Sequence, residues 1–173
     1  VFAGFAAFLD PPKESAPAAI AALERSGVAI KILTGDSDRV SLHVCAALEI
    51  PIEGMLTGPE VAAMSDEALG ARLASTNLIC RVTPAQKNRI ILALKRRGHV
   101  VGFMGDGIND APSLHTADVG ISVDSAVDVA KDAADIILLD RDLRVVERGV
   151  REGRRTFGNI MKYVMMGTSS NFG

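Results

Sequence analysis

The stretch GFMGDGINDAP, residues 102–112, places two aspartates in a glycine-broken turn after an apolar run. Asp106 follows that run directly, and Asp110 lies where the next helix is expected to begin, so both carboxylates can face one point. Gly105 and Gly107 allow a tight turn and the close approach of a ligand. Such carboxylate oxygens suit Mg²⁺, which typically takes one or two of them together with phosphate oxygens. The alternative is a solvated, capped turn, where aspartate is also common.

Two further segments at expected strand ends carry groups that bind phosphate. Thr34 and Gly35 follow an apolar stretch and offer a hydroxyl and a backbone N–H to an oxyanion. Asp36 completes this segment, although it equally suits the N-cap of the following helix. Lys87 lies in the first turn of a later helix, where the helix dipole favours anions. An isolated lysine there is otherwise simply solvated, so its interpretation depends on its neighbours.

Arg81 and Asn109 extend the same pattern. Arg81 lies in CRVTPAQK, six residues before Lys87, and is also explained by solvation alone. Asn109 lies between the two aspartates and can donate an amide hydrogen bond to a phosphate oxygen. The sequence therefore gathers anion-binding groups around carboxylates that suit a cation.

Apolar runs alternate with helical patterns along the chain, which indicates a parallel α/β sheet. Ligands in such sheets gather outside the carboxyl ends of the strands. We expect strands in 1–10, 28–36, 78–82, 99–104, 118–122 and 135–139, and helices in 14–26, 37–48, 83–97, 109–115 and from 142 onward, with 51–75 a loop holding two short helices.

Composition narrows the class of protein. The 173 residues are 48% hydrophobic and suffice for one packed domain. Nineteen basic and 21 acidic residues give a net charge of -2, which argues against a nucleic-acid binder. Cys45 and Cys80 have no metal-site spacing and are expected to be buried thiols. The N-terminus lacks the features of a signal peptide, and no run reaches the ~18 apolar residues of a membrane helix, so we expect a soluble or peripheral chain.

In order, the segments TGD, TPxxK and GDGxND match three motifs of the haloacid-dehalogenase superfamily. The longer strings FLDPPK, ILTGDS, RVTPAQK, GFMGDGINDAP and GISVDSAVDVAKDAADIILL resemble the phosphorylation domain of P-type cation-transporting ATPases. The closing GRRTFGNIMKYVMMGTSSNFG resembles the stalk helix that leads into the fifth membrane span of those pumps. The resemblance covers essentially the whole chain and is greatest to the bacterial magnesium-transporting members.

This resemblance implies a mechanism and residue roles. In the family, an aspartate of a DKTGT motif attacks the γ-phosphate of ATP and forms an aspartyl-phosphate, while Mg²⁺ neutralises charge on the phosphoryl group. Carried over by motif, the metal ligands are Asp106 and Asp110, and Asp110 also holds Lys87. By the same resemblance, the phosphoryl group is contacted by Thr34, Gly35, Lys87 and Asn109, and the nucleotide side holds Asp36 and Arg81.

The chain departs from the family in one respect, because it contains no DKTGT. We therefore interpret residues 1–141 as the second segment of the phosphorylation domain and residues 142–173 as the stalk helix leading towards a membrane span. The expected fold is a Rossmann-like, haloacid-dehalogenase-type α/β sheet that is incomplete, with the central nucleophile-bearing strand absent and two unpaired edges in its place. Alone, the chain is expected to lack ATPase activity, to be marginally stable or self-associating, and to bind Mg²⁺ weakly or not at all.

Within a pump of this family the expected partners are ATP, Mg²⁺ and the nucleotide-binding, actuator and transmembrane parts, with this domain on the cytoplasmic side of the plasma membrane. A free-standing phosphatase of the superfamily is one alternative. It needs a DxD at an early strand end, and the DxD of residues 36–38, which follows Thr-Gly and opens a helix, occupies the place of the second motif. A non-catalytic module that binds phosphate or a partner is the other, and the stalk-like ending argues against it. Residues 141–162 hold seven basic and three acidic residues, which suits an anionic membrane surface or a solvated helix face.

Overall fold

The computed structural model describes residues 15–140 and 142–171, with side chains up to residue 169, so the strand expected in 1–10 lies outside the described residues. The helices are α1 (Ala16–Arg25), α2 (Asp38–Ala47), α3 (Gly58–Ala63), α4 (Asp66–Leu73), α5 (Pro84–Arg96), α6 (Ala111–Thr116), α7 (Asp128–Asp132) and α8 (Arg144–Asn171), with a 3-10 turn η1 (Ile108–Asp110). The strands are β1 (Ile32–Leu33), β2 (Met55–Thr57), β3 (Leu78–Cys80), β4 (Gly102–Met104), β5 (Val119–Val123) and β6 (Ile136–Leu138).

Local sequence signals account for several helix ends. The Thr83 hydroxyl accepts a hydrogen bond from the N–H of Gln86, whose side chain accepts one from the N–H of Thr83 in return, which is the predicted capping box of α5. Ser65 caps α4 in a similar way, accepting from the N–H of Ala68 at 3.2 Å. Gly27 and Gly98, which follow α1 and α5, have φ of 73° and 83°, a left-handed conformation that glycine adopts without a steric penalty.

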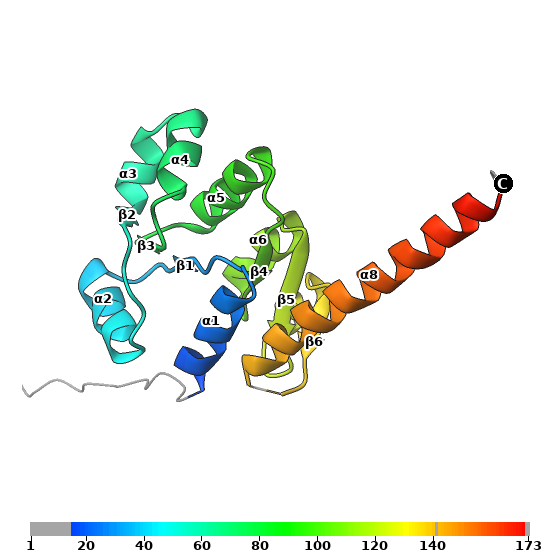
Figure 1. Cartoon of the computed structure of the whole chain (residues 1–173). Helices are drawn as coiled ribbons and strands as arrows, with labels where there is room; N and C mark the ends of the chain where they lie inside the picture. The colour runs from blue at the N-terminus through cyan, green and yellow to red at the C-terminus, as the bar shows by residue number, and fades with distance from the viewer. Residues whose placement is uncertain (1–14, 141, 172–173) are drawn as a thin grey trace, which may run out of the picture.

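The strands form two parallel sheets of three strands each, ordered β1-β3-β2 and β4-β5-β6. Strand β1 is an edge of the first sheet and β4 an edge of the second, and no described strand pairs with both (Figure 1). The resemblance implies a gap between these two strands, where the nucleophile-bearing strand of the family would lie. The expectation of a loop with two helices over 51–75 omitted β2, which pairs with β3 in the register Met55–Leu78. Three residues are too few to show an alternating pattern, so β2 is defined by its partner.

The two sheets differ in how well they are covered. Around the first sheet, helices α2 to α5 bury a large apolar core that includes Leu56, Leu69, Ile79 and Ile90. The core of the second sheet is smaller, with Leu114, Ala126 and Ala130 at its centre.

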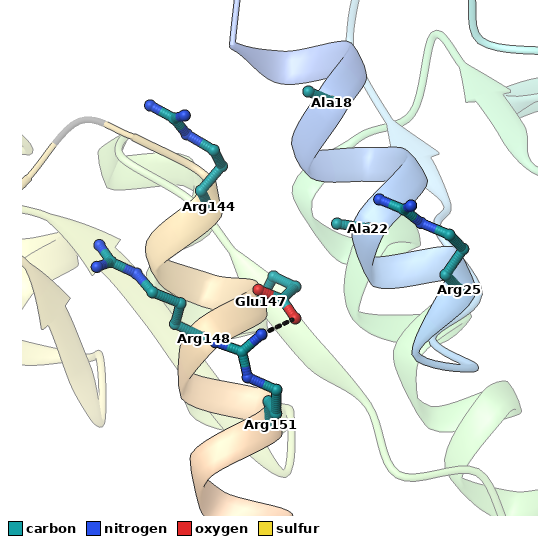
Figure 2. A pocket seen from close by; sticks show the side chains of 7 residues that line it. All are labelled: Ala18, Ala22, Arg25, Arg144, Glu147, Arg148 and Arg151. Atoms are coloured by element: carbon teal, nitrogen blue, oxygen red, sulfur yellow. Dashed lines mark ion pairs between the residues drawn. The ribbon is translucent and has the colours of Figure 1, made fainter.

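The C-terminal helix α8 starts beside α1 and then extends away from the α/β body (Figure 1). The Arg154 guanidinium donates a hydrogen bond to the Ser26 carbonyl and so joins α8 to the end of α1. A groove of ≈ 570 Å³ lies between the two helices. Figure 2 shows Glu147 and Arg151 of α8, an ion pair at 3.6 Å, on the side that faces α1, with Arg148 turned away from it. None of the residues that line this groove belongs to residues 105–110, the turn that carries Asp106 and Asp110 and is called the aspartate turn below.

Beyond this contact, the apolar side chains of α8 face solvent. Phe157, Tyr163 and Met166 are all exposed. None of the helices in the described part of the chain combines the length and the apolar character needed to cross a membrane.

Candidate functional site

The turn after β4 is shaped by Gly105. Its N–H donates to the carbonyl of Ile121 on β5, and its own carbonyl accepts from the buried Ser122 hydroxyl at 2.9 Å, so two bonds fix it to the neighbouring strand. A Cβ atom at Gly105 would lie 2.5 Å from the Cβ of Asp110. Only glycine therefore lets the Asp110 side chain fold back onto the end of β4.

Lys87 and Asp110 form the central contact of the site. The Lys87 ammonium lies 2.7 Å from a carboxylate oxygen of Asp110, and the two side chains are only 15% and 13% exposed. Lys87 comes from the first turn of α5, while Asp110 is the N-cap residue of α6. The other Asp110 oxygen accepts a long bond of 3.4 Å from the N–H of Gly107. The ion pair thus joins a helix of the first sheet to the turn of the second.

Asp106 lies at the opening of the same turn and is exposed. Its backbone carbonyl accepts from the N–H of Val127, whereas its carboxylate makes no hydrogen bond or ion pair within residues 15–140 and 142–169. Asn109 is likewise exposed, and its amide has no partner in the same part of the chain. These two side chains are therefore free to meet a ligand from solution.

The donor set fits Mg²⁺ bound with water and phosphate rather than a closed protein cage. One unpaired carboxylate, Asp106, stands near a second, Asp110, that is already held by Lys87. The described residues contain no cluster of three or more histidine, cysteine, aspartate or glutamate side chains that could hold a metal ion. Mg²⁺ commonly binds through one or two carboxylates and keeps several waters.

The segment after β1 forms a tight turn. The Asp36 N–H donates to the Thr34 hydroxyl at 3.1 Å, and that hydroxyl donates to the Asp36 carboxylate at 3.0 Å. Gly35 is exposed at the tip, and a Cβ there would meet only the Val82 carbonyl, at 3.7 Å. The Thr34 carbonyl accepts from the N–H of Val82, so this turn is attached to the loop that leads into α5.

Arg81 stands in that loop with an unusual backbone. Its φ is 54°, in the left-handed region that residues other than glycine rarely adopt. Its N–H donates to the carbonyl of Asp36 at 2.9 Å, and its guanidinium makes an ion pair of 2.7 Å with Asp38. The hydrogen bond from Arg81 lowers the pKa of the Asp38 carboxyl below its ordinary value. Sequence reasoning did not identify Asp38 as the partner of Arg81, although the DxD of residues 36–38 drew attention to it.

Gly58 is a second residue that the sequence did not single out. A Cβ on Gly58 would lie 2.1 Å from the carbonyl oxygen of Arg81, so only glycine fits against this strained peptide. The Gly58 carbonyl also accepts from the side-chain amide of Gln86 at 2.8 Å. A Gly-Pro pair at a helix start was the available signal, but it does not reveal which backbone the glycine approaches.

The predicted residues therefore fall into two groups. Lys87 and Asp110 are in direct contact, with Asp106 and Asn109 in the same turn. The second group holds Thr34, Gly35, Asp36 and Arg81. No hydrogen bond or ion pair joins the two groups directly in the described part of the chain, and they are linked through the Thr34–Val82 bond and the start of α5. The catalytic and binding roles of all eight residues remain predictions.

Comparison with known proteins agrees with these features. The family of haloacid dehalogenase-like hydrolases matches residues 2–118. The whole chain is 56% identical to the "Magnesium-transporting ATPase, P-type 1" of Salmonella typhimurium and 54% identical to that of Escherichia coli, covering 19% of each of those proteins. It is 38% identical to the "Probable cation-transporting ATPase F" of Mycobacterium tuberculosis, over 98% of the chain and 20% of that protein. The chain thus spans about a fifth of the length of these relatives.

A solved structure shares the fold. It is described as "Conformational changes in the catalytic domain of the CPx-ATPase CopB-B upon nucleotide binding" and superposes with a TM-score of 0.59 at 28% identity, over 79% of this chain and 44% of that one. The resemblance to P-type ATPases that the motifs indicate is thereby confirmed, and so is the α/β fold with a long C-terminal helix. By its sequence match and its fold, the chain belongs to the haloacid dehalogenase-like hydrolases.

Proposed function

We propose that this chain supplies the Mg²⁺- and phosphoryl-binding half of the aspartyl-phosphate site of an ATP-driven cation pump, with magnesium as the transported ion. The observation that carries the proposal is the Lys87–Asp110 pair beside the unpaired carboxylate of Asp106, at the carboxyl end of β4. The similarity to magnesium-transporting ATPases over the whole chain supports the choice of cargo.

Each residue has a physical task in this proposal. Lys87 places a positive charge near the start of α5, where it attracts phosphoryl oxygens, and Asp110 holds that ammonium in place. Thr34, Gly35 and Asn109 offer hydrogen bonds to the same oxygens. Asp36 and Arg81 lie on the side from which the nucleotide enters. The aspartate that attacks ATP is provided outside these 173 residues, since DKTGT is absent from them.

Asp106, with the second oxygen of Asp110, would hold the magnesium ion of the site. Such an ion supplies charge neutralisation for the transferring phosphoryl group. Asp106 is exposed and its carboxylate is unpaired, so no bond within the described chain has to break before it binds. Because water and phosphate complete the coordination, we expect the chain alone to bind Mg²⁺ in the millimolar range or more weakly.

In the whole pump, ATP, the nucleotide-binding and actuator parts and the membrane-spanning part are the partners, and this domain lies on the cytoplasmic side of the plasma membrane. Residues 1–141 are the second segment of the phosphorylation domain, and residues 142–173, which include α8, are the stalk. The stalk transmits to the membrane-spanning part the conformational change that phosphorylation causes. The 28 residues of α8 and its exposed apolar side chains are consistent with a transmitting element that packs against other parts of the pump.

Uptake of radioactive Mg²⁺ by cells that express the full-length protein tests this function. Asp106→Asn is expected to abolish uptake, while Glu67→Gln, which removes an exposed carboxylate from α4 outside the site, leaves it intact. Uptake that survives Asp106→Asn would show that the role assigned to Asp106 is wrong. A full-length protein that forms an aspartyl-phosphate from ATP but does not transport Mg²⁺ would show that magnesium is not the transported ion. It would leave the proposed phosphoryl-transfer site in place.

The activity of the chain by itself is a separate test. Purified as 173 residues, it is expected to release no phosphate from ATP above background, because the nucleophile is missing. A stable monomer with robust, Mg²⁺-dependent turnover would contradict this expectation.

A further inference from the structure

Asp38 has a feature that its position in the sequence does not explain. It is the first residue of α2, where a carboxylate already favours the helix dipole, and this alone would account for an aspartate there. Its carboxylate is nevertheless directed at a residue 43 positions away, the guanidinium of Arg81, at 2.7 Å. Asp38 thus makes a contact between the start of α2 and the loop that leads into α5.

The stability of the fold does not account for this contact. The Arg81 and Asp38 side chains are 57% and 34% exposed, and ion pairs between exposed side chains typically contribute little to stability. What the pair does is restrict a long, flexible side chain to one orientation. Confining an arginine side chain costs rotamer entropy, and the binding of a ligand has to offset that cost unless the protein has already ordered the side chain.

The backbone around Arg81 is also held in place. Leu78, Ile79 and Cys80 of β3 are buried, as is Val82, whereas Arg81 between them is exposed. The left-handed φ of 54° is what turns this one residue out at the carboxyl end of the strand.

Three contacts maintain that conformation. The Arg81 N–H is bonded to the Asp36 carbonyl, the Arg81 carbonyl is packed against Gly58, and the guanidinium is bonded to Asp38. Strained backbone of this kind persists only where its surroundings fix it, and it clusters at sites that bind ligands.

We propose that Asp38 is a positioning residue that holds the Arg81 guanidinium ready for the phosphate-bearing end of the nucleotide. The inference rests on the proposed function, in which Arg81 lies on the nucleotide side. Asp38 itself contacts no substrate. Its carboxylate occupies one edge of the guanidinium fork and leaves other N–H donors of the fork for phosphate oxygens.

The test is the ATP dependence of steady-state hydrolysis by the full-length protein, measured as KM and kcat separately. Asp38→Asn is expected to raise the KM for ATP about threefold to tenfold and to leave kcat at saturating ATP within about twofold, since pre-orientation affects binding. Asp38→Glu keeps the charge on a side chain longer by one methylene, and it is expected to recover most of the affinity. Arg39→Ala, in the same turn of α2, is the matched control and is expected to leave KM unchanged.

Arg81→Ala distinguishes the role of Arg81 in binding nucleotide from the role of Asp38 in positioning Arg81. If Arg81→Ala raises the KM for ATP and Asp38→Asn does not, Arg81 binds nucleotide without the help of Asp38 and this inference is overturned. If neither changes the KM, the assignment of Arg81 to the nucleotide side is itself wrong. If Asp38→Asn lowers the melting temperature and kcat with no change in KM, Asp38 is a structural residue and the inference fails. An effect of Asp38→Asn on KM that is absent in the Arg81→Ala background confirms that Asp38 acts through Arg81.

Discussion

The molecule has two halves, one built on the sheet β1-β3-β2 and the other on the sheet β4-β5-β6. Both sheets have three parallel strands, but the two halves differ in how much of their apolar surface is buried. In the first, β3 lies between two parallel partners and all three of its residues are buried. In the second, β5 occupies the same central place, yet Ile136 and Ile137 on its neighbour β6 are exposed, as is Met104 on β4. The strand pairing is thus alike, while the apolar covering is not.

This difference indicates where each half obtains its stability. The first half, with helices α2 to α5, has a core large enough to hold its loops in a fixed conformation. The second half carries the aspartate turn on a sheet whose apolar side chains are only partly covered, so burial of those side chains requires contacts from beyond the described residues. We therefore expect the first half to be the more stable unit and the second to depend on the rest of the protein.

The largest expected effect comes from matched truncations in the two sheets. Ile79 on β3 is 0% exposed and Ile137 on β6 is 41% exposed. Ile79→Ala removes fully buried methyl groups and leaves a cavity, so we expect it to lower the free energy of unfolding by about 4 kcal/mol, against about 1 kcal/mol for Ile137→Ala. Urea denaturation followed by circular dichroism measures both. Equal losses would mean that the second sheet is as well packed as the first.

The next effect concerns the Lys87–Asp110 ion pair, one of the two ion pairs by which α5 is joined to the second half within the described residues. Lys87→Met leaves the nearly buried carboxylate of Asp110 without its partner, and we expect a loss of about 2 kcal/mol. In Lys87→Met/Asp110→Asn no charge is left unpaired, so stability is expected to return to within about 1 kcal/mol of wild type. A double-mutant cycle from urea denaturation gives the coupling. A coupling near zero would show that this ion pair does not help to hold the halves together.

Much of this architecture follows from local rules and was therefore predictable. Gly27 and Gly98 end helices because they accept positive φ, and Thr83 with Gln86 starts one because their side chains satisfy free N–H groups. Apolar runs between such signals predict parallel strands. The order of motifs then placed Lys87 and Asp110 together by resemblance, and the structure has that contact.

The features that were not predicted depend on residues far apart in the sequence. The partner of Arg81 is 43 residues away, and no pattern near Asp38 distinguishes a partner of arginine from an ordinary first-turn acid. Gly58 approaches a backbone more than 20 residues away, which only the fold brings near. Strand β2 is three residues long and exists because β3 offers it hydrogen bonds. Tertiary contacts, rather than local propensity, decide all three.

A smaller effect tests the ion network that supports the first half. Arg89 on α5 pairs with Asp66 at 2.8 Å and also donates to the carbonyls of Val61 and Met64, at 2.7 and 2.6 Å. Arg89→Ala leaves those carbonyls without donors, and we expect a loss of about 1–2 kcal/mol. Arg96 also pairs with Asp66 but bonds no carbonyl there, so Arg96→Ala is the matched control, with a smaller loss. Equal losses for the two variants would assign the effect to charge alone.

The same network has a pH dependence with a definite sign. Hydrogen bonds from Arg89 and, to a smaller extent, from Arg96 lower the pKa of the Asp66 carboxyl below its ordinary value. A carboxyl whose pKa is lower in the folded state than in the unfolded state stabilises the fold when the pH is above the unfolded-state pKa. That contribution is lost as the pH falls through the lower, folded-state pKa. An NMR titration of the Asp66 carboxyl is expected to give a midpoint below the ordinary value of an aspartate, and Arg89→Ala is expected to move it upward. A midpoint that Arg89→Ala leaves in place would remove Arg89 as the cause.

The smallest expected effect is a difference in thiol labelling between wild type and Ile137→Ala. Cys45 and Cys80 are both buried in the first half, so a reagent cannot reach them in the folded protein. Burial also raises the pKa of the Cys45 thiol, so little of its reactive thiolate is present at neutral pH. Labelling therefore requires that the first half opens. Ile137→Ala weakens only the second sheet and is expected to change the labelling rate by less than about twofold, whereas Ile79→Ala, through its loss of about 4 kcal/mol, raises it by up to about 1,000-fold. The release of thionitrobenzoate from a disulfide reagent measures both rates. If Ile137→Ala raises the labelling rate by the factor that corresponds to its loss in free energy of unfolding, the two halves open as one unit. The halves would then differ only in the exposure of their side chains.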